Sequence, residues 1–335
     1  MPNPHVRECM LGNIMLIPEL YCPFPPALSP HVEAVQRHLN QWMQARRYLQ
    51  TEAALERFKA GKFAWTTGRA HPDASFESVL IVATYMSWLF LVDDLCDEAA
   101  LGREPERLKI QHQELIEHMK HPRPVGEEDS PLVVGLAEIW ARMRLRAAPG
   151  WVERFIRTFE DYTQGCQWEA ENRAHHRVPS LAEYVERRRQ TSALYVFFDL
   201  IELAEQVVLP AEIHARLHEL KVRANDGVAW FNDIISLEKE VRVGDVHNLI
   251  IVLQHEDGLS VQAAVELAAR LFNARIREFV ELEQRLPSFG VEIDVPLQRY
   301  LRCLRAWIRG NMDWSYETGR YGQARTTPVL ERCAS

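Results

Sequence analysis

The most apolar stretch of this chain reads VLIVATYMSWLFLVDDLCD at residues 79–97. Its first 14 residues, 79–92, are interrupted by only two polar side chains, Thr84 and Ser87. A membrane-spanning helix needs about 20 apolar residues, so this shorter run predicts a helix buried in a protein core. Because such a helix is apolar on most faces, other helices have to cover it. We therefore expect residues 75–95 to form a central helix of the fold.

The rest of the chain shows helical patterning almost throughout. No run of alternating apolar and polar residues bounded by turns is present, so strand content is expected to be near zero. Ser180, with Glu183 three residues later, is typical of a helix N-terminus. Prolines at 18, 23, 25, 26 and 30 predict an extended N-terminal segment over residues 1–30. Further helices are predicted at residues 31–48, 132–147, 151–173, 180–207, 211–220, 222–242, 260–286 and 296–316, with one more beginning at Pro105.

No linker or change of composition divides the chain, so residues 1–335 are expected to form one all-α domain, with a loose C-terminal tail at 326–335. Hydrophobic residues make up 47% and charged residues 26% of the chain, which is ordinary globular composition. The net charge of −8 argues against a nucleic-acid partner. The six cysteines form no CxxC pair and fit a reducing compartment. We expect a cytoplasmic protein with no membrane partner and no signal peptide.

Two carboxylates stand where the apolar helix ends. Asp93 and Asp97 are four residues apart and therefore share one helical face. They repel each other unless a cation lies between them, and carboxylate oxygens suit Mg²⁺. The competing interpretation is an acidic helix end on the surface, although acids at a helix C-terminus oppose the helix dipole.

A second polar face occurs in the sequence NDIISLEKE at residues 232–240. Asn232, Ser236 and Glu240 are spaced i, i+4 and i+8, and they offer an amide oxygen, a hydroxyl and a carboxylate, again suited to Mg²⁺. Lys239 adds a cation beside them. A solvated polar stripe is the alternative, but the apolar residues 228–231 immediately before it indicate a buried zone.

Three consecutive arginines, Arg187, Arg188 and Arg189, follow in the helix predicted from Ser180. An arginine run is usually a solvated face, but guanidinium groups also bind phosphate through paired N–H donors. Near the C-terminus Trp314 is followed by Arg320 and Tyr321. An Arg-Tyr pair by itself predicts no function, so its role depends on the other motifs.

In combination these motifs resemble the class I terpene synthases, specifically the bacterial sesquiterpene cyclase type. The resemblance covers roughly residues 16 to 325. It rests on RAHPDA at 69–74, Trp88, DDLCD at 93–97, residues 168–173 and 184–192, NDIISLEKE at 232–240 with Asn248, Trp314, and Arg320-Tyr321. It implies a single-domain helical bundle with the active site in a central apolar cavity.

The resemblance also assigns residues. It implies that Asp93 and Asp97 hold two Mg²⁺ ions and that a third is held by Asn232, Ser236 and Glu240. Arg188 aligns best with the family's diphosphate-sensing arginine, with Arg187 and Arg189 as alternatives. Thr191 and Ser192 fall at a helix break where the family has its linker and effector residues, and the effector acts through its main-chain carbonyl. The remaining members of the implied diphosphate clamp are Lys239, Arg320 and Tyr321.

The implied reaction is Mg²⁺-dependent ionisation of farnesyl diphosphate, followed by cyclisation of the carbocation to a sesquiterpene hydrocarbon or alcohol. The cation needs an apolar pocket with aromatic faces, for which the candidates are Phe90, Tyr195, Phe198, Trp230 and Trp314. The first alternative is a diterpene cyclase acting on geranylgeranyl diphosphate. A chain-elongating prenyltransferase would have two Asp-rich motifs, which residues 232–240 do not match, and a non-catalytic helical binding protein would need no intact metal ligands. A monomer and a homodimer are both compatible with the sequence.

Overall fold

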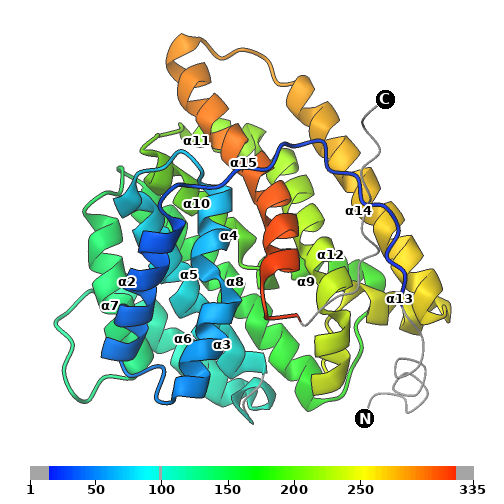
Figure 1. Cartoon of the computed structure of the whole chain (residues 1–335), viewed down its shortest axis with the longest axis horizontal. Helices are drawn as coiled ribbons and strands as arrows, with labels where there is room; N and C mark the ends of the chain where they lie inside the picture. The colour runs from blue at the N-terminus through cyan, green and yellow to red at the C-terminus, as the bar shows by residue number, and fades with distance from the viewer. Residues whose placement is uncertain (1–14, 98–99, 322–335) are drawn as a thin grey trace.

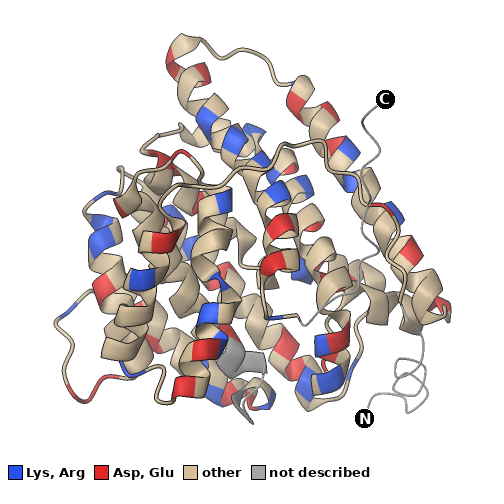
Figure 2. Cartoon of the chain, in the orientation of Figure 1, with Lys and Arg blue, Asp and Glu red and all other residues tan. Residues whose placement is uncertain are grey.

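A computed structural model describes residues 15–97 and 100–321, without the side chains of residues 94–101. Within these residues every regular element is helical and no strand is present, which confirms the all-α prediction. Figure 1 shows the helices packed side by side in a single body. Acidic and basic positions are interspersed along the helices (Figure 2).

The helices in chain order are α2 (Val32–Ala45), α3 (Glu52–Gly61), α4 (Phe63–Ala70), α5 (Phe76–Asp97), the short 3₁₀ turn η1 (Ala100–Arg103), α6 (Pro105–Lys120), α7 (Pro131–Arg144), α8 (Trp151–Ala174), α9 (Leu181–Thr191), α10 (Leu194–Glu205), α11 (Ala211–Arg216), α12 (His218–Val243), α13 (Leu249–Asp257), α14 (Val261–Gln284) and α15 (Val291–Glu317).

Helix α5 lies at the centre of the first half of the fold, where α2, α4, α7 and α10 pack against it. Its residues 76–93 are long and apolar enough to cross a membrane, but 72% of this stretch is buried inside the fold. Trp88 shows how polar atoms are accommodated there, since its ring N–H donates to the carbonyl of Leu132 at 3.0 Å. Because its apolar faces are covered by other helices, α5 is the core helix that its sequence predicts.

The second half of the fold is organised around α12, which packs against α9, α10, α13, α14 and α15. The segment of residues 15–30, which precedes α2, has no regular structure and runs across the outside of α14 and α15 (Figure 1). The segment is held there by hydrogen bonds to the side chain of Asn273, which accepts from the Tyr21 amide at 2.6 Å and donates to the Glu19 carbonyl at 3.1 Å.

The structure divides the helix predicted at 180–207 into α9 and α10. The break lies at Ser192 and at Ala193, whose φ of 58° is in the left-handed region that residues other than glycine rarely adopt. The Leu194 amide at the start of α10 is capped by Ser192 Oγ at 3.2 Å. No proline or glycine marks this position, so the residue pattern alone predicted one continuous helix, whereas the family resemblance implied the break.

Other boundaries also differ from the prediction. Helices α3, α4 and α13 were not predicted; they are short, with 10, 8 and 9 residues. Helix α15 begins at Val291 and contains Pro296, which was predicted to start the helix. The side chain of Asp294 accepts from the Phe289 amide at 2.9 Å and so stabilises this earlier start. Pro296 is the sixth residue of α15, so the helix lacks the N–H that would bond the carbonyl of Glu292.

Candidate active site

A cavity lies among α4, α5, α8, α9, α10, α12 and α15. On several of these helices its wall changes from apolar to charged toward the helix C-terminus. On α5 Met86, Leu89 and Phe90 are followed by Asp93. On α12 Val228 and Ala229 are followed by Asn232, Ser236 and Glu240. Charged residues of the wall are Asp93, Glu169, Arg173, Arg188, Lys239, Glu240, Asp245 and Arg320.

Asp93 lies on the same face of α5 as Met86, Leu89 and Phe90, because these residues are three to four positions apart. Its carboxylate therefore continues an apolar stripe of the cavity, which excludes the interpretation of Asp93 as an acid on the outer surface. Asp97 ends α5, and its side chain lies outside the described residues.

Asn232, Ser236 and Glu240 line the cavity together, as their spacing on one face of α12 predicts. The hydroxyl of Ser236 lies 2.7 Å from Glu240 Oε1 and 2.7 Å from the carbonyl of Asn232. The other oxygen of Glu240 accepts a hydrogen bond from Asn248 Nδ2 at 2.7 Å. The same amide of Asn248 donates to the main-chain carbonyl of Asp233 at 2.7 Å, so it ties Glu240 to the helix.

The carboxyl of Glu240 has its pKa raised to about 8. Burial is the largest cause, followed by the negative charges of Asp233 and Asp245, while hydrogen bonds from Ser236 and Asn248 oppose the shift. A buried carboxylate with two acidic neighbours is unfavourable without a cation. The all-oxygen donor set of Asn232, Ser236 and Glu240 therefore fits a hard divalent ion.

Arg188 is the arginine of the triplet that reaches the cavity. Its Nε and Nη2 donate to Asp233 Oδ1 at 3.1 and 3.0 Å, and Nη2 also donates to Asn232 Oδ1 at 3.1 Å. Burial, the largest single cause, disfavours the charge on Arg188, but Asp233, Tyr184, Glu169 and Glu240 together outweigh it and hold the pKa of the guanidinium well above its ordinary value. Asp233 is itself fixed by a hydrogen bond from the Tyr184 hydroxyl.

Arg187 and Arg189 have other partners and do not line the cavity. Arg187 Nη1 donates to Gln190 Oε1 at 3.0 Å. The guanidinium of Arg189 donates to both oxygens of Asp226 at 2.7 and 3.0 Å. The structure thus distinguishes three consecutive arginines that sequence reasoning left as alternatives.

The residues after α15 close the charged end of the cavity. Tyr321 accepts a hydrogen bond from Asn232 Nδ2 at 2.8 Å, and its ring packs edge-on against Trp314 with the centroids 5.8 Å apart. Burial raises the pKa of the Tyr321 hydroxyl, so this group is neutral at physiological pH. The guanidinium of Arg320 lies over the ring of Phe90, 4.7 Å from its centroid. Lys239 lies on the same wall.

Ser192 also reaches the cavity, at the break between α9 and α10. Its hydroxyl donates to Asn225 Oδ1 at 2.9 Å on α12. Asn225 in turn donates to the carbonyl of Arg189 at 2.9 Å, so two side chains hold the non-helical turn in place. Thr191, Ser192 and Ala193, which span the break, all line the cavity.

Only some of the aromatic side chains that line the cavity are those predicted from the sequence. Phe90 and Trp314 line the cavity as expected, and Tyr162, Phe197 and Trp307 join them. The prediction that Tyr195, Phe198 and Trp230 line it disagrees with the structure, in which these three side chains are absent from the wall.

Helix rotation explains this difference. On α10 the inward face carries Leu194 and Phe197, so Phe198 points elsewhere and packs against Tyr195, with ring centroids 6.2 Å apart. On α12 Ala229 and Asn232 face the cavity, which turns Trp230 toward α14, where the guanidinium of Arg275 lies 5.2 Å from its ring centroid.

One part of the wall was missed in the sequence. Asp245 and His247 lie in the loop after α12, and Asp245 pairs with Arg173 of α8, whose Nη2 is 2.9 Å from Asp245 Oδ2. His247 Nδ1 is 2.7 Å from Asp245 Oδ1. Burial opposes ionisation of Asp245, but Arg173 and His247 hold its pKa well below the ordinary value. The signal available was Gly244, which ends α12 at a positive φ of 79° and reverses the chain.

Comparisons with known proteins agree with this geometry. The family model described as "Terpene synthase family 2, C-terminal metal binding" matches residues 84–278. The chain is 35% identical over 321 residues to germacrene A synthase of Nostoc punctiforme, covering 95% of this chain and 99% of that protein. It is 38% identical over 311 residues to 10-epi-cubebol synthase of Sorangium cellulosum, covering 91% and 98%.

Solved structures show the same fold. The crystal structure of a-eudesmol synthase superposes with a TM-score of 0.81 at 26% identity, covering 90% of this chain and 100% of that one. The linalool/nerolidol synthase of Streptomyces clavuligerus gives a TM-score of 0.79 at 26% identity, with 89% and 100% covered. The sequence match, the helical fold and the site together show that this chain belongs to the terpene synthase family and is a class I terpene synthase of the bacterial type.

Proposed function

We propose that this terpene synthase is a sesquiterpene cyclase. It ionises farnesyl diphosphate in a Mg²⁺-dependent step, cyclises the carbocation to a hydrocarbon or alcohol, and releases diphosphate. The observation that carries the proposal is a cavity whose wall passes from aromatic side chains to a cluster of carboxylates, guanidinium groups and an amine. A relative supports the substrate, since a protein of Roseiflexus castenholzii that is 34% identical over 304 residues is named "(+)-T-muurolol synthase ((2E,6E)-farnesyl diphosphate cyclizing)".

The metal-binding role is assigned to side chains of α5 and α12. Asp93 and Asp97 would hold two Mg²⁺ ions, and Asn232, Ser236 and Glu240 the third. Bound there, the ions supply Lewis-acid stabilisation of the negative charge that develops on the diphosphate. The raised pKa of Glu240 supports this assignment, because a cation is the group that a buried, crowded carboxylate lacks.

The diphosphate-binding role belongs to Arg188, Lys239, Arg320 and Tyr321. When the allylic C–O bond breaks, its electron pair leaves with the diphosphate, and donors that already point at the leaving group lower the barrier. Arg188 is pre-oriented because Asp233 and Asn232 hold its Nε and Nη2, which leaves Nη1 to bind a diphosphate oxygen.

The hydrocarbon end of the substrate would lie among Phe90, Tyr162, Phe197, Trp307 and Trp314. Their π faces stabilise positive charge and keep water from the cation until the ring closes. We assign to Ser192 the role of effector through its main-chain carbonyl, whose partial negative charge favours the departing cation. The break at Ala193 supports this assignment, because a carbonyl at a helix break is not committed to a regular helical hydrogen bond.

The decisive experiment incubates the purified enzyme with Mg²⁺ and, separately, C10, C15 and C20 linear diphosphates, and analyses the extract by gas chromatography–mass spectrometry. A cyclic C15 product from farnesyl diphosphate alone is expected. A cyclic product only from geranylgeranyl diphosphate would show that the substrate is the C20 diphosphate, and the site residues would keep their proposed roles. Elongated diphosphates, or no turnover with any of the three, would contradict the proposed reaction.

A further inference from the structure

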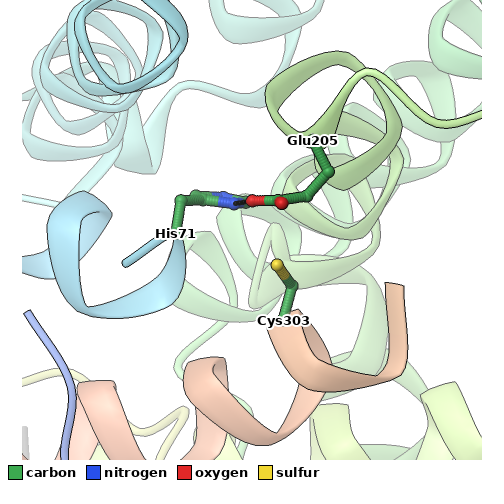
Figure 3. Close-up of side chains that lie close together, drawn as sticks. All are labelled: His71, Glu205 and Cys303. Atoms are coloured by element: carbon green, nitrogen blue, oxygen red, sulfur yellow. Dashed lines mark ion pairs between the residues drawn. The ribbon is translucent and has the colours of Figure 1, made fainter. Parts of the chain in front are cut away.

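We infer that His71, Glu205 and Cys303 form a binding site for a divalent transition-metal ion of the zinc class, behind the aromatic wall of the cavity. The three residues come from different parts of the chain: His71 follows α4, Glu205 ends α10 and Cys303 lies within α15. Figure 3 shows the imidazole and the carboxylate directed at each other, with the thiol directed toward both. None of the three lines the active-site cavity.

All three side chains are removed from solvent. Their exposed fractions are 0% for His71, 4% for Glu205 and 2% for Cys303. Both ring nitrogens of His71 and the Oε1 atom of Glu205 are buried without a hydrogen-bond partner among the described residues. A buried polar atom left unpaired costs about 1–3 kcal/mol. Two of these atoms, His71 Nδ1 and Glu205 Oε1, face each other, so one ion between them would give both a close partner.

The distances are those of ligands around one ion. His71 Nδ1 and Glu205 Oε1 are 3.6 Å apart, which is too long for a side-chain hydrogen bond. Two light-atom ligands of a tetrahedral zinc ion, each about 2.1 Å from the metal, lie about 3.4 Å apart. The sulfur of Cys303 is within 4.8 Å of both atoms. Coordination would draw the sulfur inward by up to about 1 Å, since a Zn–S bond is about 2.3 Å long.

The donor types select the metal. An imidazole nitrogen, a thiolate and one carboxylate oxygen are the ligands of zinc, whereas Mg²⁺ prefers oxygen alone. The site is thus chemically distinct from the all-oxygen set on α12. With a thiolate and a carboxylate, a divalent ion makes a neutral cluster, which suits a buried position. The second carboxylate oxygen of Glu205 lies 3.5 Å from Arg299 Nη2, so one oxygen remains for the ion.

Binding requires one proton to leave. Burial, and then the charge of Glu205, raise the pKa of the Cys303 thiol well above its ordinary value, so without an ion the thiol is protonated. A bound zinc ion stabilises the thiolate, and the proton passes to solvent. Arg302 Nη1 lies 2.5 Å from Asp73 Oδ2 nearby. These two side chains neutralise each other, so Arg302 does not supply the positive charge that the ion would bring.

The site would connect three segments that carry the active site. Cys303 lies one helical turn before Trp307 on α15, and the Trp307 ring lies edge-on to His71 with the centroids 6.2 Å apart. Trp307 lines the cavity and packs on Phe197 of α10, with ring centroids 5.2 Å apart. A bound ion would therefore hold α4, α10 and α15 in place directly behind the aromatic wall.

The test uses the full-length chain, expressed without a polyhistidine tag in zinc-supplemented medium and freed of loose metal by gel filtration. Elemental analysis by plasma mass spectrometry is expected to find about one zinc ion per chain. After replacement by Co²⁺, absorption spectra are expected to show a thiolate-to-cobalt charge-transfer band in the near ultraviolet. Neither readout depends on turnover or on the proposed substrate.

The Cys303→Ser variant keeps the side-chain volume and should stay folded, with zinc affinity lowered at least about 100-fold and the charge-transfer band lost. The matched control is Cys22→Ser, which changes a half-buried thiol outside the cluster and should leave both readouts unchanged. A wild-type chain that takes up no zinc and gives no cobalt band would overturn the site. Equal metal content in wild type and Cys303→Ser would do the same, since it would show adventitious binding elsewhere.

Discussion

The side-chain amide of Asn232 donates a hydrogen bond to the hydroxyl of Tyr321 over 2.8 Å, joining residues 89 positions apart. On its other side Asn232 Oδ1 accepts from Arg188 Nη2 at 3.1 Å. One side chain of α12 is thus held between two groups assigned to diphosphate binding. An amide oxygen has two lone pairs, so Asn232 can accept from Arg188 and still offer one lone pair to a metal ion.

Replacing Asn232 by alanine is expected to give a folded protein whose kcat/KM is lowered at least about 100-fold. The change removes a proposed metal ligand, the hydrogen bond to Tyr321 and one of the hydrogen bonds that orient Arg188. Steady-state turnover with farnesyl diphosphate, together with circular dichroism, measures the effect. The control is Glu238→Gln, an exposed position on the opposite side of α12. Normal activity of Asn232→Ala would rule out the assignment of Asn232 to the third metal.

Arg188→Lys is expected to lower kcat about 100-fold and to destabilise the fold by about 1–3 kcal/mol. Lysine keeps the charge but cannot reproduce the planar donors that reach Asp233 and Asn232. The matched control is Arg187→Lys, whose guanidinium bonds Gln190 away from the cavity. Steady-state kinetics of both variants measure kcat, and urea unfolding measures their free energies of unfolding. If the Arg187 variant lost activity and the Arg188 variant did not, the diphosphate would be bound by the other arginine.

Phe90→Ala is expected to change the product mixture more than it changes the rate of substrate consumption. Phe90 shapes the cavity wall, and the loss of its ring opens space beside Trp314, whose centroid lies 6.2 Å away. Product profiles by gas chromatography–mass spectrometry, set beside diphosphate release, separate the two effects. Phe198→Leu serves as the comparison, because Phe198 is buried off the wall and should leave the profile intact. Identical profiles from wild type and Phe90→Ala would remove Phe90 from the product-determining surface.

Acid stability is expected to depend on His112. Burial lowers the pKa of its imidazole from 6.5 to about 4. The unfolded chain therefore binds more protons between these values, and stability from this residue is complete above pH 6.5 and is lost as pH falls toward 4. The loss amounts to up to about 3 kcal/mol.

The measurement compares urea unfolding of wild type and His112→Leu at several pH values. The stability difference between the two proteins should shift in favour of the leucine variant as pH falls from 6.5 to 4. His121→Gln, at a side chain that is 74% exposed, should show no such trend. A difference that stays constant across this range would mean that His112 is already able to ionise in the folded protein.

The amino-acid sequence by itself determined the helical class, the buried position of α5 and the shared face of the proposed metal ligands on α12. Each of these depends on spacing along one helix. Asn232, Ser236 and Glu240 share a face wherever α12 is placed, because 3.6 residues complete a turn. The apolar run before Asp93 likewise requires burial in any arrangement, since its transfer from water is favourable regardless of the neighbours.

Only the tertiary structure decided which of the neighbouring side chains reach the cavity. A helix can rotate about its axis without changing its sequence pattern, and packing alone selected Phe197 over Phe198 and Arg188 over Arg187. Packing also brought together pairs that no local sequence pattern predicts, such as Arg173 with Asp245 or His71 with Glu205. Local periodicity determines which residues lie on the same face of a helix, but the direction of that face depends on contacts between segments that are far apart in the chain.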